Sequence, residues 1–309
     1  MAETAIRTEG LSMRYGKKWA LEGLDLEVSQ GEIFGFLGPN GAGKTTTIKI
    51  LTGLLRASGG SSSIFGRASR ASSSHRYFGY APENPYLYDF LTPQELLVFY
   101  CRLQSLPAGM HEEEVTRVLW ATGLVDVRHQ KVKTFSKGMK GRLALAQALL
   151  GSPPIIFLDE PTSGQDPLAR VAIRDIMLRH REWGGTVFLN SHILTDVERV
   201  CDRVAIINRG KLVSQGAVAE LERGGDRLYV EAAGIEGTAL AGLDRAGKRW
   251  ERVEGGIFID GVGREETPEL TRMLVENGAR IYAVQPQKRS LEDYFIEVVR
   301  DDERPYAGA

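Results

Sequence analysis

The stretch Gly38-Pro39-Asn40-Gly41-Ala42-Gly43-Lys44-Thr45 decides how this chain folds. An apolar run at residues 33–37 precedes it and a helix-forming run at residues 46–51 follows, so the order predicts strand, phosphate-binding loop and helix. Glycines let backbone N–H groups turn toward phosphate oxygens, and the next helix adds its positive N-terminal dipole. Lys44 would reach the β- and γ-phosphates, and the Thr45 hydroxyl would meet Mg²⁺. The candidate ligands of a magnesium nucleoside triphosphate are Gly38, Pro39, Asn40, Gly41, Ala42, Gly43, Lys44, Thr45 and Thr46.

Two carboxylates follow a second apolar run. Residues 155–158 read Ile-Ile-Phe-Leu and are succeeded by Asp159 and Glu160, which predicts a buried strand with acidic side chains at its end. We expect Asp159 to hold the metal shell and Glu160 to act as general base on the attacking water. The alternative is a solvated strand end with no chemical role.

A histidine ends a third apolar run. Residues 186–189 are followed by Asn190, Ser191 and His192, which makes His192 the only one of the five histidines directly after a predicted core strand. We expect His192 to sense the γ-phosphate, with Lys44 and Glu160 completing the catalytic set. The alternative is a histidine that only satisfies local hydrogen bonds.

A serine and a glycine introduce the apolar helix at residues 143–150. In Phe135-Ser136-Lys137-Gly138-Met139, Ser136 is first of all an N-cap. It could also bind an anion, together with the Gly138 amide and the helix N-terminus. The sequence leaves both interpretations open.

The 309 residues are enough for a large domain and a smaller one. We expect a first domain over residues 1–222, with short antiparallel strands over residues 5–28 and a helical insert at about 84–150. Residues 57–74, rich in Ser and Gly, predict a flexible surface segment broken only by a short hairpin strand. Residues 223–309 predict a small α+β accessory domain. Its expected strands are residues 228–232, 257–259 and 281–284, and its expected helices are residues 268–277 and 290–300.

Composition limits the function classes. No apolar stretch is long enough to span a membrane, and the N-terminus lacks a secretion signal, so we expect a cytoplasmic protein. Cys101 and Cys201, the only cysteines, fit buried free thiols in a reducing compartment. The net charge is −1, with no concentrated basic stripe, so we expect no nucleic-acid partner.

The ordered set of motifs over about residues 4–222 resembles the nucleotide-binding subunit of ATP-binding-cassette (ABC) transporters. In that family's terms, residues 38–45 resemble the Walker A loop and residues 155–160 the Walker B strand. The signature segment corresponds to residues 135–139, the D-loop to residues 163–166, which end at Asp166, and the switch histidine to His192. Tyr15 occupies the position of the aromatic residue that stacks on adenine; without the resemblance it would be an ordinary surface tyrosine.

The resemblance implies an α/β fold: a P-loop NTPase core with a mainly parallel sheet, an antiparallel β subdomain and a helical subdomain. It also implies ATP and Mg²⁺ as cofactors. The signature segment of one subunit, with Ser136 and Gly138, would close over ATP held by Walker A of a second ATPase subunit, as a homo- or heterodimer. A separate membrane permease would contact the helical lobe and the segment near Glu83, holding the protein peripherally on the inner face of the membrane.

Three departures from the family pattern stand out. Glu83 occupies the position of the usual Q-loop glutamine, where its carboxylate could still face Mg²⁺ or water. Lys137 and Met139 replace a glycine and a glutamine of the signature, while Ser136 and Gly138 are kept. Gln165 replaces a usual leucine of the D-loop, for which we expect a modest effect on the partner interface.

The subtype is less sharply defined. The Pro-Glu Q-loop, the Ser-Lys-Gly-Met signature and the ending at residues 290–297 look like bacterial export-type ATPase subunits. One alternative is a soluble cassette ATPase that remodels nucleic acid or ribosomes, although such proteins commonly join two cassettes or insert coiled coils. Another is a non-hydrolysing regulatory module, which intact Lys44, Asp159, Glu160 and His192 argue against.

Overall fold

A computed structural model describes residues 3–223, 226–288 and 290–303. The chain forms two compact units, one of residues 1–217 with 298–309 and the other of residues 218–297. The predicted boundary after residue 222 lies close to the first division. The last turns of the C-terminal helix group with the first unit.

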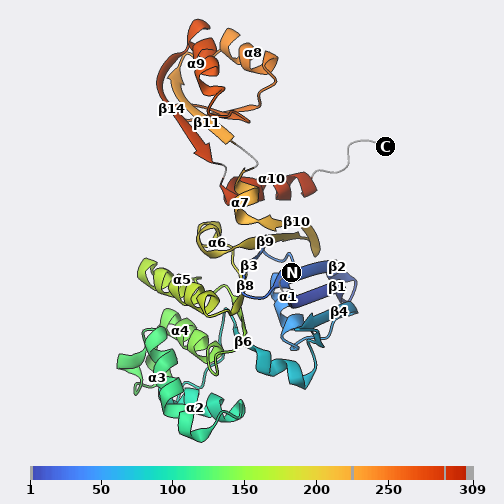
Figure 1. The fold of residues 1–309 in the computed structure, drawn as a ribbon, viewed down its shortest axis with the longest axis vertical. Helices are drawn as coiled ribbons and strands as arrows, with labels where there is room; N and C mark the ends of the chain where they lie inside the picture. The colour runs from blue at the N-terminus through green and yellow to red at the C-terminus, as the bar shows by residue number, and fades with distance from the viewer. Residues whose placement is uncertain (1–2, 224–225, 289, 304–309) are drawn as a thin grey trace. The chain divides into compact units, whose positions relative to one another are not determined.

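A six-stranded sheet forms the centre of the first unit (Figure 1). Its order is β10-β9-β3-β8-β7-β6, with parallel pairing from β9 to β6 and an antiparallel β9–β10 pair at one edge. Its strands are β3 (Ile33–Leu37), β6 (Phe78–Ala81), β7 (Ile155–Asp159), β8 (Thr186–Asn190), β9 (Arg203–Asn208) and β10 (Lys211–Ala217). Every residue of β3, β7 and β8 is buried, as expected for parallel strands covered on both faces.

The parallel register places the candidate chemistry at one edge of this sheet. Phe36 of β3 and Asp159 of β7 both lie opposite Asn190 of β8. On the far side of β7, Ala81 of β6 lies opposite Leu158. The segments that follow these strands therefore emerge side by side at their carboxyl ends, where ligands bind in open α/β sheets.

A second, antiparallel sheet of the first unit has the order β2-β1-β4-β5. Its strands are β1 (Thr4–Tyr15), β2 (Lys18–Ser29), β4 (Gly59–Ile64) and β5 (Arg67–Ala68). The prediction of a mostly flexible segment over residues 57–74 is wrong. Ser61, Ser62 and Ser63 pair with β1, and a 3₁₀ helix, η1 (Ser72–Tyr77), follows. The ladder to β1 supplies the order that the local composition does not predict.

The helices of the first unit lie on either side of this framework. In Figure 1, α2, α3 and α4 gather in one lobe, apart from the antiparallel sheet. Thr92 caps α2 in a capping box with Glu95, and Ser136 caps α4. The helices are α1 (Lys44–Leu51), α2 (Pro93–Leu103), α3 (His111–Ala121), α4 (Lys137–Ala148), α5 (Pro167–Glu182) and α6 (Leu194–Val200). Short 3₁₀ turns occur at η2 (Ala108–Met110), η3 (Val125–Val127) and η4 (Val132–Thr134).

The second unit contains an antiparallel sheet of order β12-β13-β11-β14. Leu228 and Val230 of β11, with Ile257 and Ile259 of β13, share one hydrophobic core with residues of α8 and α9. Its elements are α7 (Val218–Arg223), β11 (Asp226–Ala233), α8 (Thr238–Arg245), β12 (Trp250–Val253), β13 (Gly256–Asp260), α9 (Thr267–Glu276) and β14 (Arg280–Lys288), and α10 (Leu291–Glu303) leads from it into the first unit. Sequence reasoning missed α8 and β12. Among the described residues, no helix has the length and apolarity needed to cross a membrane.

Candidate active site

The phosphate-binding loop joins β3 to α1, and two of its glycines are sterically required. A Cβ on Gly38 would lie 2.2 Å from the carbonyl oxygen of Ile207. At Gly43, where φ is +112°, a Cβ would lie 2.5 Å from the carbonyl oxygen of Ala20. Close approach and left-handed backbone therefore exclude other residues. Pro39, Asn40, Gly41 and Ala42 lie between these glycines, and Thr45 and Thr46 lie in the first turn of α1.

Lys44 begins α1 and lies beneath the loop. Its side chain is buried, and Nζ donates to the carbonyl oxygens of Gly38 at 2.7 Å and Pro39 at 3.2 Å. Burial lowers the pKa of Lys44, while the nearby carboxylates of Glu160 and Asp159 oppose that shift. The loop thus presents a partly desolvated ammonium group, which suits recognition of a polyanion.

Asp159 ends β7 and is only 3% exposed. Its carboxylate accepts a hydrogen bond from Nδ2 of Asn190, the residue opposite it on β8. Burial raises the pKa of Asp159, and the Asn190 amide and the Thr45 hydroxyl act against the rise. Asn190 was not among the candidate site residues. A polar residue ending an otherwise apolar strand beside Asp159 is the signal that could have identified it.

Glu160 and His192 form a pair within the chain. The Nδ1 atom of His192 lies 2.6 Å from Oε2 of Glu160, and the backbone N–H of His192 donates to the same oxygen at 3.2 Å. Burial raises the pKa of Glu160, while the His192 imidazole lowers it. Glu160 has a left-handed φ of 54°, and its backbone N–H donates to the carbonyl oxygen of Asn190 at 2.9 Å. The turn and these two contacts therefore hold the Glu160 carboxylate against His192.

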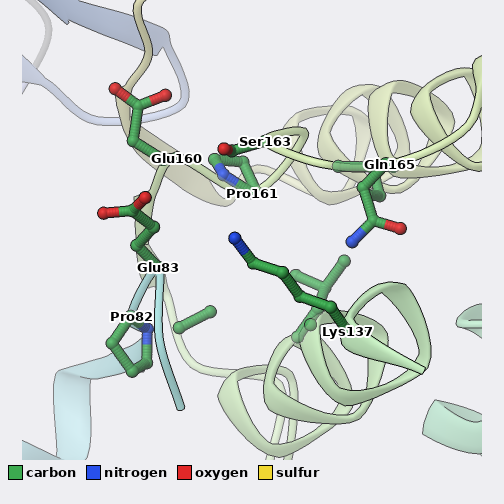
Figure 2. A pocket seen from close by; sticks show the side chains of 11 residues that line it. Pro82, Glu83, Lys137, Glu160, Pro161, Ser163 and Gln165 are labelled. Carbon is green, nitrogen blue, oxygen red and sulfur yellow. The ribbon is translucent and has the colours of Figure 1, made fainter. Parts of the chain in front are cut away.

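Glu83 follows β6 and belongs to the same charged region. Its carboxylate raises the pKa of both Lys44 and Asp159. Glu83 and Glu160 line one side of a hollow whose other side is formed by Lys137 and Gln165 (Figure 2). The predicted replacement of the Q-loop glutamine therefore places an additional negative charge near the phosphate-binding loop.

The remaining candidates lie outside this cluster. Ser136 accepts a hydrogen bond from Met139 N at 3.2 Å at the start of α4, and Gly138 lies in the first turn of that helix. Asp166 caps α5 by accepting from Ala169 N at 2.9 Å. Tyr15 ends β1 with 52% of its surface exposed. Within the described part of the chain, no hydrogen bond or ion pair joins any of these residues to Lys44 or Asp159.

The charges of the cluster suit a metal-bound triphosphate. Three carboxylates, those of Glu83, Asp159 and Glu160, act on the one ammonium group of Lys44. No group of three or more His, Cys, Asp or Glu side chains in the described residues could hold a metal by itself. Mg²⁺ commonly binds through one or two carboxylates and substrate phosphates, so the residues present fit an ion that arrives with the nucleotide.

A phosphate-binding loop after one parallel strand, an Asp–Glu pair after a second and a histidine after a third define a P-loop nucleotide hydrolase. The family model described as ABC transporter matches residues 21–163. The ABC transporter ATP-binding protein YdbJ of Bacillus subtilis is 36% identical over 96% of each chain. The daunorubicin resistance ATP-binding protein DrrA3 of Streptomyces coeruleorubidus is 33% identical over 98% of each chain.

A solved structure gives the same assignment. It carries the description "ATP binding subunit of ABC transporter", is 33% identical and superposes with a TM-score of 0.66, covering 71% of this chain and 92% of its own. The chain belongs to the ATP-binding subunits of ABC transporters. It is an ATPase that binds ATP and powers transport, and the predicted α/β P-loop fold is confirmed. Membership in this family implies a membrane permease partner and dimerisation.

Proposed function

We propose that this subunit drives export through a separately encoded permease, with two ATP molecules held between paired ATPase subunits. The observation that carries the proposal is the cluster in which Lys44, Asp159 and the Glu160–His192 pair meet at one sheet edge. The name of the daunorubicin resistance relative supports export. Tyr15 would stack on adenine, and the subunit would lie on the inner face of the membrane.

The proposed roles within the site follow from its geometry. Glu160 takes a proton from the attacking water, and His192 orients that carboxylate and contacts the γ-phosphate. Thr45 and Asp159 would hold Mg²⁺, with Glu83 in reach of its water shell; the ion supplies positive charge to the phosphate oxygens. Lys44 contributes a fixed ammonium group on the loop side.

A second subunit would complete each site. Ser136 and Gly138 lie at the N-terminus of α4, a position that suits anion binding, and among the described residues neither forms a hydrogen bond with Lys44. We infer that they contact ATP held by the partner subunit, with Asp166 at the same interface. Binding energy of ATP to the closed dimer would then drive the conformational change, and hydrolysis would reset it.

The Glu160→Gln variant tests this proposal. We expect it to bind ATP, lose nearly all hydrolysis and remain as an ATP-bound dimer, because the amide cannot accept the proton. Purified with ATP from gently solubilised native membranes, it should bring down a polytopic membrane protein, which mass spectrometry identifies. Lys44→Ala, which removes the phosphate-binding ammonium group, is the matched control and should bring down less.

Undiminished turnover of Glu160→Gln would contradict the role of Glu160. Ribosomal proteins or nucleic acid in place of a membrane protein would favour the soluble remodelling ATPase.

An exposed aromatic cluster supports the position of the permease contact. It lies between Glu83 and the end of α2, where Tyr86 is 100% and Phe90 67% exposed. Tyr88 contacts Phe90 and Phe99, with ring centroids 5.8 Å and 5.9 Å apart. Exposed apolar patches of this kind mark interaction sites. The segment therefore offers an apolar surface adjacent to the candidate active site.

Charged substitutions in this aromatic cluster should weaken permease binding without affecting the ATP site. We predict that combining Tyr86→Asp with Phe90→Asp weakens association with the permease about tenfold or more, because aromatic anchors dominate interface energies. ATP binding by the isolated subunit should not change. Trp183→Asp, which alters an aromatic residue that is 73% exposed outside the cluster, is the control. Equal retention of the cluster variant and the control in co-purification would contradict this docking surface.

A further inference from the structure

The side chain of Gln165 packs against another segment of its own subunit. It belongs to the D-loop, residues 163–166, yet it is only 9% exposed and lies against α4. We propose that Gln165 is a positioning residue that holds the D-loop and the signature segment together as one unit. The functional part of this inference rests on the proposed function. The modest effect on the partner interface that the sequence predicts for Gln165 stays a prediction.

Two glycines of α4 make room for the Gln165 carboxamide. A Cβ on Gly138 would lie 2.7 Å from Oε1 of Gln165, and one on Gly141 would lie 2.9 Å from Nε2. Cβ atoms essentially never show contacts under 3.0 Å. Gly138 and Gly141 are three residues apart, so they share one face of the helix. Glycine is a poor helix former, and this close approach gives the two glycines a packing role.

One hydrogen bond holds the side-chain amide of Gln165 in this groove, and a second holds its backbone. Its Nε2 donates to the carbonyl oxygen of Gly138 at 3.4 Å, a long hydrogen bond. The backbone carbonyl oxygen of Gln165 accepts from Nε of Arg170 in α5 at 3.3 Å. Gln165 therefore joins the starts of two helices, with Asp166 capping α5 and Ser136 capping α4.

A second contact between the same segments lies beside the first. A Cβ on Gly164 would lie 3.7 Å from Cδ and 3.8 Å from Nζ of Lys137. Figure 2 shows Lys137 and Gln165 extending into the space between α4 and the loop that follows Glu160. Lys137 of α4 thus passes along the D-loop, and Gln165 of the D-loop enters the groove of α4. Such interdigitation ties the position of Ser136 to that of the D-loop.

This arrangement predicts a specific kinetic signature. A change in the Gln165 groove should displace the D-loop and the signature segment, which would contact the nucleotide of the partner subunit. Lys44 and the phosphate-binding loop belong to other elements and should stay in place. Turnover should therefore fall while ATP affinity at the subunit's own loop stays the same. A merely structural role would instead lower thermal stability and ATP binding together.

The Gly141→Ala variant is the direct test, in the full chain assembled with its permease. Alanine has a higher helix propensity than glycine. If the Cβ position of residue 141 were unobstructed, the variant would therefore be more stable and equally active. We expect turnover to fall roughly 10- to 100-fold without a rise in the unfolding midpoint, because the methyl group displaces the amide. The affinity of the variant for ATP should remain unchanged. Gly109→Ala, at a helical-lobe glycine with nothing within 4 Å of its Cβ position, is the matched control.

The double variant Gly141→Ala with Gln165→Ala distinguishes the mechanism. Removing the amide leaves space for the new methyl group, so the two changes should be strongly non-additive in both turnover and free energy of unfolding. Full turnover with raised stability in Gly141→Ala, or additive effects in the cycle, would overturn the proposal. If the unaltered protein hydrolyses no ATP, the proposed function fails. In that case, unfolding measurements on the unaltered protein, Gly141→Ala, Gln165→Ala and the double variant still decide whether Gln165 and residue 141 are coupled.

Discussion

Glu160 and His192 show how single residues set the chemistry of this site. The left-handed backbone of Glu160, with φ at 54°, is unusual for a residue with a side chain. The hydrogen bond from its N–H to the carbonyl oxygen of Asn190 holds that turn. Burial raises the pKa of the carboxyl group, and the imidazole of His192 pulls it back down. The pair therefore tunes a base that must be ionised to act.

Replacing His192 should move the pH dependence of hydrolysis. Glu160 is active when deprotonated, so turnover is present above its pKa and is lost as the pH falls through it. Because His192 lowers that pKa, we predict that His192→Gln shifts the acid limb of kcat/KM to higher pH and reduces the maximal rate. Measuring kcat/KM across pH for both proteins tests this. An acid limb that stays in place, or moves to lower pH, would show that another group controls it.

The same residues show what sequence reasoning can reach. The placement of Lys44, Asp159 and His192 was predictable because each ends an apolar strand of the parallel sheet or follows one after a short loop. Asn190 was passed over, because its partnership with Asp159 depends on strand register. The inward orientation of Gln165 depends on Gly138 and Gly141 of α4, which lie 27 and 24 residues earlier in the chain, so no local pattern around Gln165 reports it.

At the scale of elements, the sequence predicts fully buried apolar strands well and polar or exposed strands poorly. The fully apolar strands β3, β7 and β8 are recognisable because both of their faces are covered. The strand β4 reads Gly-Gly-Ser-Ser-Ser-Ile and owes its conformation to pairing with β1. Likewise, β12 has exposed residues between half-buried ends, and its partner β13 completes it. Tertiary pairing overrides weak local preference in both strands.

Close packing of β6 on α4 gives a prediction at this scale. A Cβ on Gly79 would lie 1.7 Å from the carbonyl oxygen of Ala148, so strand and helix backbones would have to separate. We predict that Gly79→Ala lowers the free energy of unfolding by about 3 kcal/mol. Urea unfolding measures this, and Gly109→Ala should stay within about 0.5 kcal/mol of the unaltered protein. Equal stability of the two variants would show that β6 and α4 can move apart freely.

At the scale of the whole molecule, the question is whether the ATP-binding unit works without the residues that follow it. We propose that a fragment of residues 1–222 folds and binds ATP, because the phosphate-binding loop, Asp159 and His192 all precede its end. Its stability should nevertheless fall. Asp302, in the last turn of α10, accepts a hydrogen bond of 2.8 Å from Nδ2 of Asn208, a side chain only 3% exposed. The fragment lacks Asp302.

Loss of Asp302 should lower the free energy of unfolding by about 1–3 kcal/mol, since the buried amide of Asn208 gives up a hydrogen bond to a charged group. Asp302→Ala in the full chain isolates this contribution, so its unfolding free energy should account for much of the fragment's loss. Calorimetric titration with ATP then tests whether binding survives. A fragment that keeps its circular dichroism but binds no ATP would show that residues 223–309 help to form the site. Residues 1–222 would then be an independently folding unit that cannot bind ATP by itself.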